Sequence, residues 1–208
     1  MAALVLPIFP LPDITFFPHT LMPLHVFEAR YRALVMDALA RDRRLCIAQL
    51  RPGYETNYGG RPAVHAVAGA GEIVNWERLA TGRYNILVKG ECRVRIDAER
   101  PSDTLYRIAL AQRLDDVPPA GDLGVVLARI RTACGTLLRA LDRPSDLLDT
   151  ALADGQAPGM IADRVTAAVL PDAALRQTLL ETLDVGARVE RLAQALDDLV
   201  RELKGGRE

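Results

Sequence analysis

The 208-residue chain has room for one large domain or two small ones, and its 50% hydrophobic content allows a core of ordinary size. A formal net charge of −1 creates no long-range field for nucleic acid or an acidic membrane, so neither is an expected partner. Three widely spaced cysteines indicate neither a disulfide framework nor a zinc site, and each lies in an apolar run, which predicts buried thiols in a reducing compartment. Because the N-terminal apolar run is broken by prolines and no run is long enough to span a membrane, a cytoplasmic protein is expected.

The first forty residues change abruptly from extended to helical signals. Leu4 to Leu6 begin an apolar run, and the prolines after them cannot donate ladder hydrogen bonds, which predicts an edge or terminal strand. Residues 21–27 also favour an extended conformation, because a residue that precedes proline avoids the helical region. From Glu28 the period is that of an amphipathic helix, whose predicted core-facing residues are Tyr31, Leu34, Val35, Ala38 and Leu39.

Strand signals continue through the next eighty residues. Extended segments are predicted at 45–50, 64–67, 72–76 and 106–114, and the glycines within 68–71 indicate a bulge or a close backbone approach. Alternating apolar residues from Tyr84 to Ile96, interrupted at Gly90, predict a hairpin with one solvated face. Six or seven short strands and one helix within residues 1–117 favour a closed or nearly closed β-barrel.

Strand signals stop at the proline-containing segment 115–121, and residues 118–208 are predicted to form an all-α subdomain of four to five helices. Its first helix is expected over 123–141, before Arg143 and Pro144. Ser145 is predicted to cap a short segment up to Ala153, Pro158 to begin the next helix, and Asp172 to cap the one after it. The last helix carries the apolar stripe Val189, Leu192, Leu196, Leu199 and Leu203. The expected fold class is therefore α+β, with domains 1–117 and 118–208.

Two long strings carry a family resemblance. LPIFPLPDITFFPHTLMPLHVFEARYRALV near the start, and AVAGAGEIVNWERLATGRYNILVKGECRVRI over residues 66–96, resemble the N-terminal domain of Lon proteases, the substrate-binding part of that family. The string LRQTLLETLDVGARVERLAQAL is similar to the closing helices of the same domain. The resemblance implies a PUA-like β domain followed by a helical subdomain, and it implies polypeptide binding.

No residue set in the sequence predicts catalysis. A phosphate-binding loop motif is absent, and Ser102 and Ser145 both precede aspartate in turn or cap contexts. His19, His25 and His65 do not have the spacing of metal ligands, and His25 is expected to be a hydrogen-bonded structural imidazole. We therefore expect no catalytic residues, no cofactor, no metal, and a protein that is not an enzyme.

Aromatic residues outside the core pattern are the first candidates for binding. Tyr54 and Tyr58 lie in the turn-rich loop 52–62, and Trp76 lies in a predicted strand. Tyrosine and tryptophan combine a large contact area with a polar group, so these three side chains are predicted partner contacts. The alternative is that Trp76 only covers an open end of the barrel.

Arginines form the second candidate set. Arg83, Arg93 and Arg95, with Arg107 and Arg113, are predicted to share the outer face of one sheet, although nearby glutamates would neutralise such a stripe. The leading hypothesis is a non-catalytic polypeptide-binding protein that lacks the ATPase and protease modules of Lon and acts as an adaptor. Its expected partners are polypeptide clients or a protease or chaperone. The alternative is an RNA-binding module that uses the PUA-like barrel; the sequence predicts no oligomeric state.

Overall fold

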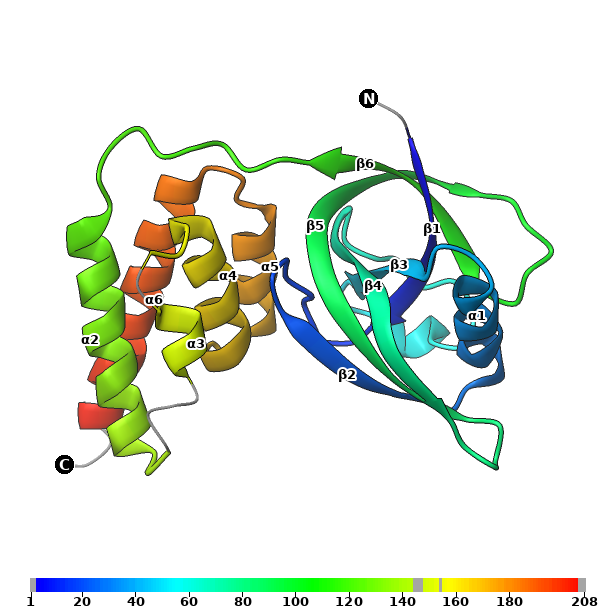
Figure 1. Cartoon of the computed structure of the whole chain (residues 1–208), viewed down its shortest axis with the longest axis horizontal. Helices are drawn as coiled ribbons and strands as arrows, with labels where there is room; N and C mark the ends of the chain where they lie inside the picture. Colours follow the sequence, from blue (N-terminus) through cyan, green and yellow to red (C-terminus); the bar gives the residue numbers. More distant parts are fainter. Residues whose placement is uncertain (1–2, 144–147, 154, 206–208) are drawn as a thin grey trace. The chain divides into compact units, whose positions relative to one another are not determined.

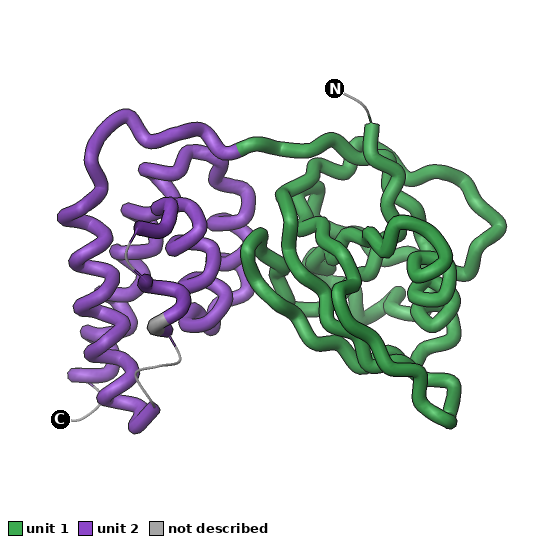
Figure 2. The backbone as a smooth tube through the Cα atoms, in the orientation of Figure 1, with its two compact units in different colours: residues 1–115 green, residues 116–208 purple. Residues whose placement is uncertain are grey.

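A computed structural model describes residues 3–143, 148–153 and 155–205. The chain divides into two compact units, residues 1–115 and residues 116–208 (Figure 2). The first unit is built mainly from strands and the second from helices (Figure 1). The fold is therefore α+β, as the sequence predicts, and each unit is described by itself below.

Five strands of unit 1 form a closed ring. The elements of unit 1 are, in chain order, β1 (Leu4–Leu11), β2 (Leu21–Val26), α1 (Ala29–Leu39), β3 (Arg44–Gln49), the short 3-10 helix η1 (Tyr54–Asn57), β4 (Val67–Arg78), β5 (Tyr84–Arg100) and β6 (Arg107–Leu114). The strand order is β2-β5-β4-β3-β1-β6, and additional pairing of β5 with β6 closes the ring. Figure 1 shows the long, curved β5 passing around the ring. Only β2 remains at an edge among the described strands, and Pro23 lies within it.

The predicted edge position of β1 is wrong, because β1 pairs with β3 in parallel and with β6 in antiparallel orientation. The Leu11 carbonyl accepts a hydrogen bond from the Leu50 N–H, which turns the odd-numbered backbone groups of β1 toward β3. The pairing of β1 with β6 ends at Ile8, so the Pro10 nitrogen faces the β6 side where no partner residue remains. The pairing of β1 with β3 begins at Ile8, so the Pro7 nitrogen faces the β3 side one residue before the first paired position. Neither proline removes a ladder hydrogen bond, so the strand tolerates both.

Two apolar cores lie on the two sides of the ring wall. The interior is filled by Leu6 and Ile8 of β1 and by mostly small side chains of the other four ring strands, which fits the narrow bore of a ring with so few strands. The small side chains are Cys46, Ala48, Ala68, Ala70, Cys92, Ala109 and Ala111. Larger side chains pack between the wall and α1, among them Phe9, Phe16, Leu34, Val35, Ile47, Ile73 and Val88. The predicted buried stripe of α1 is confirmed at Tyr31, Leu34, Val35 and Ala38, and all three cysteines are buried as predicted.

Two predicted strand boundaries are wrong, and glycines explain why. Val64 forms only an isolated bridge with Leu50, while β4 is one continuous strand with a register shift after Ala70. The predicted hairpin turn at Gly90 is absent, because β5 runs straight through it. A Cβ atom at Gly90 would lie 2.1 Å from the Phe17 carbonyl oxygen. Gly90 thus allows a close backbone approach rather than a turn.

Unit 2 contains five helices in its described residues: α2 (Gly124–Ala140), α3 (Asp149–Leu152), α4 (Pro158–Val169), α5 (Ala173–Glu181) and α6 (Val185–Gly205). Pro158 occupies the first turn of α4, and the Asp172 carboxylate accepts a hydrogen bond from the Leu175 N–H at 2.7 Å, which confirms both predicted helix starts. The predicted cap at Ser145 lies outside the described residues.

A buried arginine ties the start of unit 2 to its last helix. The Arg188 side chain is fully buried, and its guanidinium donates to Asp116 at 2.9 Å and to the Thr182 carbonyl at 2.7 Å. The carboxylate of Asp163, itself 1% exposed, lies 3.4 Å from the Arg188 Nε. Asp116 thus has a structural role that its place in a predicted linker did not indicate.

Candidate functional site

The aromatic loop predicted to bind partners is held against the start of α1. Tyr54 and Tyr58 lie close together, with 6.2 Å between their ring centroids. The Arg30 guanidinium lies 5.5 Å from the Tyr58 ring centroid and also donates to the Tyr58 carbonyl at 3.4 Å. The Tyr58 hydroxyl donates to Glu28 at 3.4 Å. These contacts leave Tyr58 37% exposed, so the two rings present a fixed edge to solvent.

Trp76 lies elsewhere on unit 1. It is 41% exposed in the C-terminal half of β4, and the Arg43 guanidinium lies 4.7 Å from its ring centroid. Arg43 follows the end of α1, whereas Glu28 and Arg30 lie at its beginning. Because α1 is 11 residues long, its two ends are about 16 Å apart. The structure therefore brings Tyr54 and Tyr58 together but does not bring Trp76 to them.

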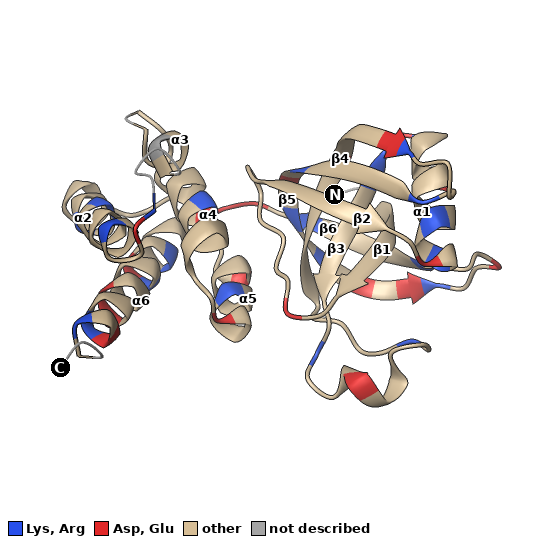
Figure 3. Ribbon diagram, turned by 90° about the horizontal axis from the view of Figure 1, so that it is seen from below, with Lys and Arg blue, Asp and Glu red and all other residues tan. Residues whose placement is uncertain are grey.

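The predicted arginine stripe does not form. Arg93 is 3% exposed, so its predicted place on a solvated face is wrong. Arg83 is exposed in the β4–β5 turn, and Arg95 pairs with Asp97 at 2.8 Å. Arg107 pairs with Glu99, and Arg113 with Asp115 at 3.0 Å. Figure 3 shows basic and acidic residues interspersed over the described part of unit 1.

Unit 2 contains an apolar groove that the sequence did not predict. Two adjoining cavities of about 400 and 460 Å³ share Pro171, Leu199 and Glu202. We call them the α6 groove; its apolar lining is Leu137, Leu141, Val169, Leu170, Pro171, Leu175, Ala195, Leu199 and Leu203. The apolar stripe of α6 is buried as far as Leu196, whereas Leu199 and Leu203 are only partly buried and line the groove. The sequence indicated the stripe and gave no sign that its last two residues line a groove.

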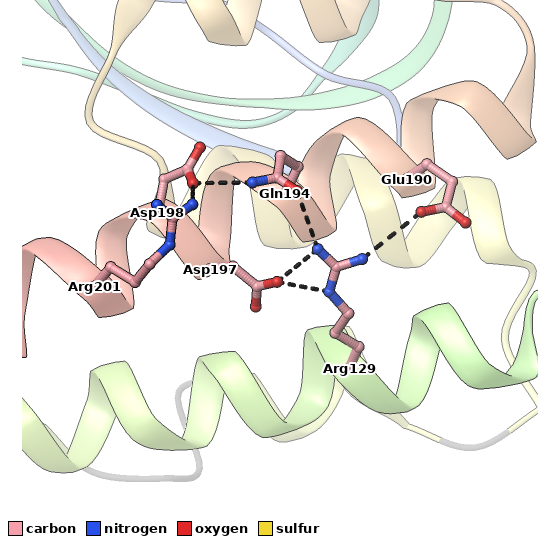
Figure 4. A network of polar contacts seen from close by, with 6 residues as sticks. All are labelled: Arg129, Glu190, Gln194, Asp197, Asp198 and Arg201. Carbon is pink, nitrogen blue, oxygen red and sulfur yellow. Dashed lines mark hydrogen bonds and ion pairs between the residues drawn. The ribbon is translucent and has the colours of Figure 1, made fainter.

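A polar network holds α6 against α2 beside this groove (Figure 4). Arg129 of α2 donates to Asp197 at 2.6 Å and to Gln194 at 3.3 Å. Gln194 in turn donates to Asp198 at 2.9 Å, and Asp198 also pairs with Arg201. Gln194 and Asp198 also line the groove, so the network fixes one of its walls.

The polar rim of the α6 groove is acidic. Asp172, Asp198 and Glu202 line it, together with Arg191, and Arg201 pairs with Asp198, so the described groups leave one negative charge. The groove therefore offers an apolar floor and a net negative edge. Such a surface favours apolar side chains that are flanked by basic ones.

Several described side chains of types that can act in catalysis are buried or make structural contacts. Burial raises the pKa of the Cys46 and Cys134 thiols to about 12, so neither forms a thiolate near neutral pH. Ser102 lies 2.8 Å from the Thr104 hydroxyl, and His25 lies 2.8 Å from the Asn85 side-chain oxygen, the structural contact predicted for it. Within the described ranges, no group of three or more His, Cys, Asp or Glu side chains could hold a metal ion. No described helix combines the length and apolarity needed to cross a bilayer.

Solved structures share this fold. The N-terminal domain of Mycobacterium avium complex Lon protease is similar with a TM-score of 0.74 and 19% identity, over 93% of this chain and 98% of that chain. The Lon N-terminal domain protein from Xanthomonas campestris is similar with a TM-score of 0.64 and 21% identity, over 91% and 96%. At these identities the likeness concerns the fold alone.

Sequence relatives give the family. Lon protease of Xanthomonas oryzae is 26% identical over 194 residues, and Lon protease 2 of Bdellovibrio bacteriovorus is 28% identical over 195 residues. Both matches cover 92% of this chain but only 23% and 24% of the relative, so the chain spans about a quarter of their length. The family model described as the ATP-dependent protease La (LON) substrate-binding domain matches residues 5–198. The chain therefore belongs to the family of Lon substrate-binding domains.

Proposed function

We propose that this chain binds polypeptide segments and that the α6 groove is a binding site for them. The observation that carries the proposal is the partly buried end of the α6 stripe, where Leu199 and Leu203 line the apolar α6 groove. Membership of a substrate-binding family supports a polypeptide as the occupant. The module would then present captured segments to a proteolytic or chaperone partner.

The occupant is an extended segment that carries apolar side chains and a nearby lysine or arginine. Burial of two leucine-sized side chains in the groove would contribute about 3–6 kcal/mol before the entropy of association is subtracted. The acidic rim formed by Asp172, Asp198 and Glu202 would select basic flanks over acidic ones. The predicted contacts at Tyr54, Tyr58 and Trp76 form a second candidate surface on unit 1, which the same experiment tests.

The experiment measures fluorescence anisotropy of labelled, C-terminally amidated apolar peptides that carry either two lysines or two glutamates. We expect the lysine peptide to bind and Leu203→Asp to weaken it by about tenfold or more, because a carboxylate would replace an apolar wall. Val125→Asp is the matched control, since Val125 is 84% exposed and lies outside the groove. Circular dichroism checks that each variant folds.

Two outcomes separate the alternatives. Unchanged binding in Leu203→Asp, together with loss in a Tyr54→Ala, Tyr58→Ala, Trp76→Ala triple variant, would move the site to unit 1. Absence of binding by either peptide would refute polypeptide binding. An RNA-binding role is not proposed, because Arg95, Arg107 and Arg113 are each paired with a carboxylate and Arg93 is buried.

A further inference from the structure

A small cavity in unit 1 lies between the loop 59–62, the start of α1 and the start of β6. Its volume is about 100 Å³, which is roughly the liquid volume of three water molecules. One side is apolar and formed by Ile8, Pro10 and Leu105. The other side carries Tyr31 and three arginines, Arg30, Arg61 and Arg107. No residue of this polar set other than Arg107 belongs to the candidate surfaces predicted from the sequence.

Tyr31 supplies an unused hydrogen-bond donor to this cavity. Its side chain is only 5% exposed, and its ring stacks on Phe9 with 4.4 Å between centroids. The hydroxyl makes no hydrogen bond to another described residue, and it is not among the enclosed polar atoms that lack a partner, so solvent or a ligand can reach it from the cavity. Burial raises the pKa of Tyr31 to about 12, against the opposing effect of Arg30, so the O–H remains a donor at neutral pH.

Arg107 is held in place by hydrogen bonds but still has N–H donors available for a ligand. Its side chain is 10% exposed, and it donates to Glu99 through two nitrogens and to the Pro62 carbonyl at 2.7 Å. A guanidinium has five N–H donors, so two remain. Arg30 is held in the same way by Glu28 at 2.9 Å. The pairs with carboxylates fix these two cations in place before any ligand arrives.

Arg61 provides the uncompensated charge. It is exposed and makes no hydrogen bond or short ion pair with the described residues, although its charge is near enough to Glu99 to contribute, after Arg107, to the lowered pKa of that carboxyl. Three guanidinium groups face this region, while Glu28 and Glu99 supply two carboxylates, so one positive charge is left over. A single charge suits a monoanion better than a dianion such as phosphate.

We infer that this cavity takes the terminal α-carboxylate of a polypeptide whose last residue has a small apolar side chain. The carboxylate would accept hydrogen bonds from Tyr31, Arg107 and Arg61. The side chain would lie against Ile8, Pro10 and Leu105. The inference rests on the proposed function in so far as the ligand is a polypeptide, and it adds recognition of the chain end.

The test compares two labelled peptides that end in alanine and differ only in a free or an amidated C-terminus. The free acid should bind about tenfold tighter than the amide, because amidation removes the charge of the acceptor. Tyr31→Phe retains the ring and its stacking on Phe9, and it should reduce that preference about five- to tenfold, as should Arg61→Gln. Arg51→Gln is the matched control, because Arg51 is exposed on the same loop and does not line the cavity.

Equal affinity for the acid and the amide would overturn the inference. Amide binding that is lost in Leu203→Asp would still support the proposed function in that case, so the two failures are distinguishable. Displacement of the acid peptide by inorganic phosphate at equal concentration would also overturn it, because the cavity would then be a simple oxoanion site. Arg61→Gln keeps the test valid if Tyr31→Phe fails to fold, since Arg61 is exposed.

Discussion

Replacement of Arg188 by methionine should destabilise unit 2 strongly. Methionine can fill most of the volume of the arginine stem, but it removes the charge that faces Asp163 and Asp116. Asp163 is 1% exposed, so its carboxylate would remain buried after the loss of this cation. The Thr182 carbonyl would also lose its 2.7 Å donor.

The expected loss is about 3–5 kcal/mol, the range found when one partner of a buried ion pair is removed. A domain of this size has a total stability of about 5–15 kcal/mol, so the variant would retain only part of it. For comparison, Arg191→Met on the next turn of α6 removes an exposed arginine and should change stability by no more than about 0.5 kcal/mol.

Urea denaturation followed by circular dichroism at the helix band measures this loss. The single tryptophan, Trp76, lies in unit 1, so its emission in the absence of urea checks that unit 1 is still folded. Asp163→Asn should destabilise the natural chain more than the Arg188→Met variant, because the variant has already lost the ion pair between Arg188 and Asp163. A loss below about 1 kcal/mol for Arg188→Met, or equal effects of Asp163→Asn in the two backgrounds, would refute the assignment of a buried ion pair.

The remaining predictions concern unit 1. Gly90→Ala should destabilise it by about 3 kcal/mol or more, because the new Cβ would meet the Phe17 carbonyl. Gly59→Ala in the same unit should be neutral, since no atom lies within 4 Å of its Cβ, and urea midpoints compare the two. Burial and the 2.8 Å hydrogen bond to Asp37 raise the pKa of Tyr106 to about 12. An unfolded tyrosine ionises near pH 10, so this stabilisation should be complete below pH 10 and disappear between about pH 10 and 12. Urea midpoints across that range should fall less in Tyr106→Phe, and an equal fall in both proteins would contradict the assignment.

Local patterns predicted the elements well where the period and the end signals were local. The α1 stripe, the first turn at Pro158 and the cap at Asp172 all follow from spacing or from a single side chain. The errors arose where a local signal had two physical meanings. Proline suggested an edge strand at Pro7 and Pro10, and glycine suggested a turn at Gly90, because the sequence does not say which neighbour faces each backbone group.

The candidate site was less predictable than the fold. Tyr54 and Tyr58 were predicted in one loop and do lie together. Trp76 contacts Arg43 near the opposite end of α1, and no local sequence rule could have predicted that separation. A signal for Arg188 was present, since it lies three residues after Val185 and four before Leu192, on the apolar face of the last helix. An arginine at such a position predicts a buried partner, and Asp116 and Asp163 are the partners that the fold supplies.

The sequence by itself determined the family, the order of strands and helices, and the face that each helix buries, because these depend on neighbouring residues and on the period of the chain. Only the tertiary structure decided which apolar side chains of a helix are covered by its neighbours. It leaves Leu199 and Leu203 partly buried in a groove, and it places Tyr31 and Arg107 in one cavity although 76 positions separate them. A periodic pattern records that a side chain needs apolar or charged neighbours, whereas the fold determines which neighbours it meets and which positions remain for a ligand.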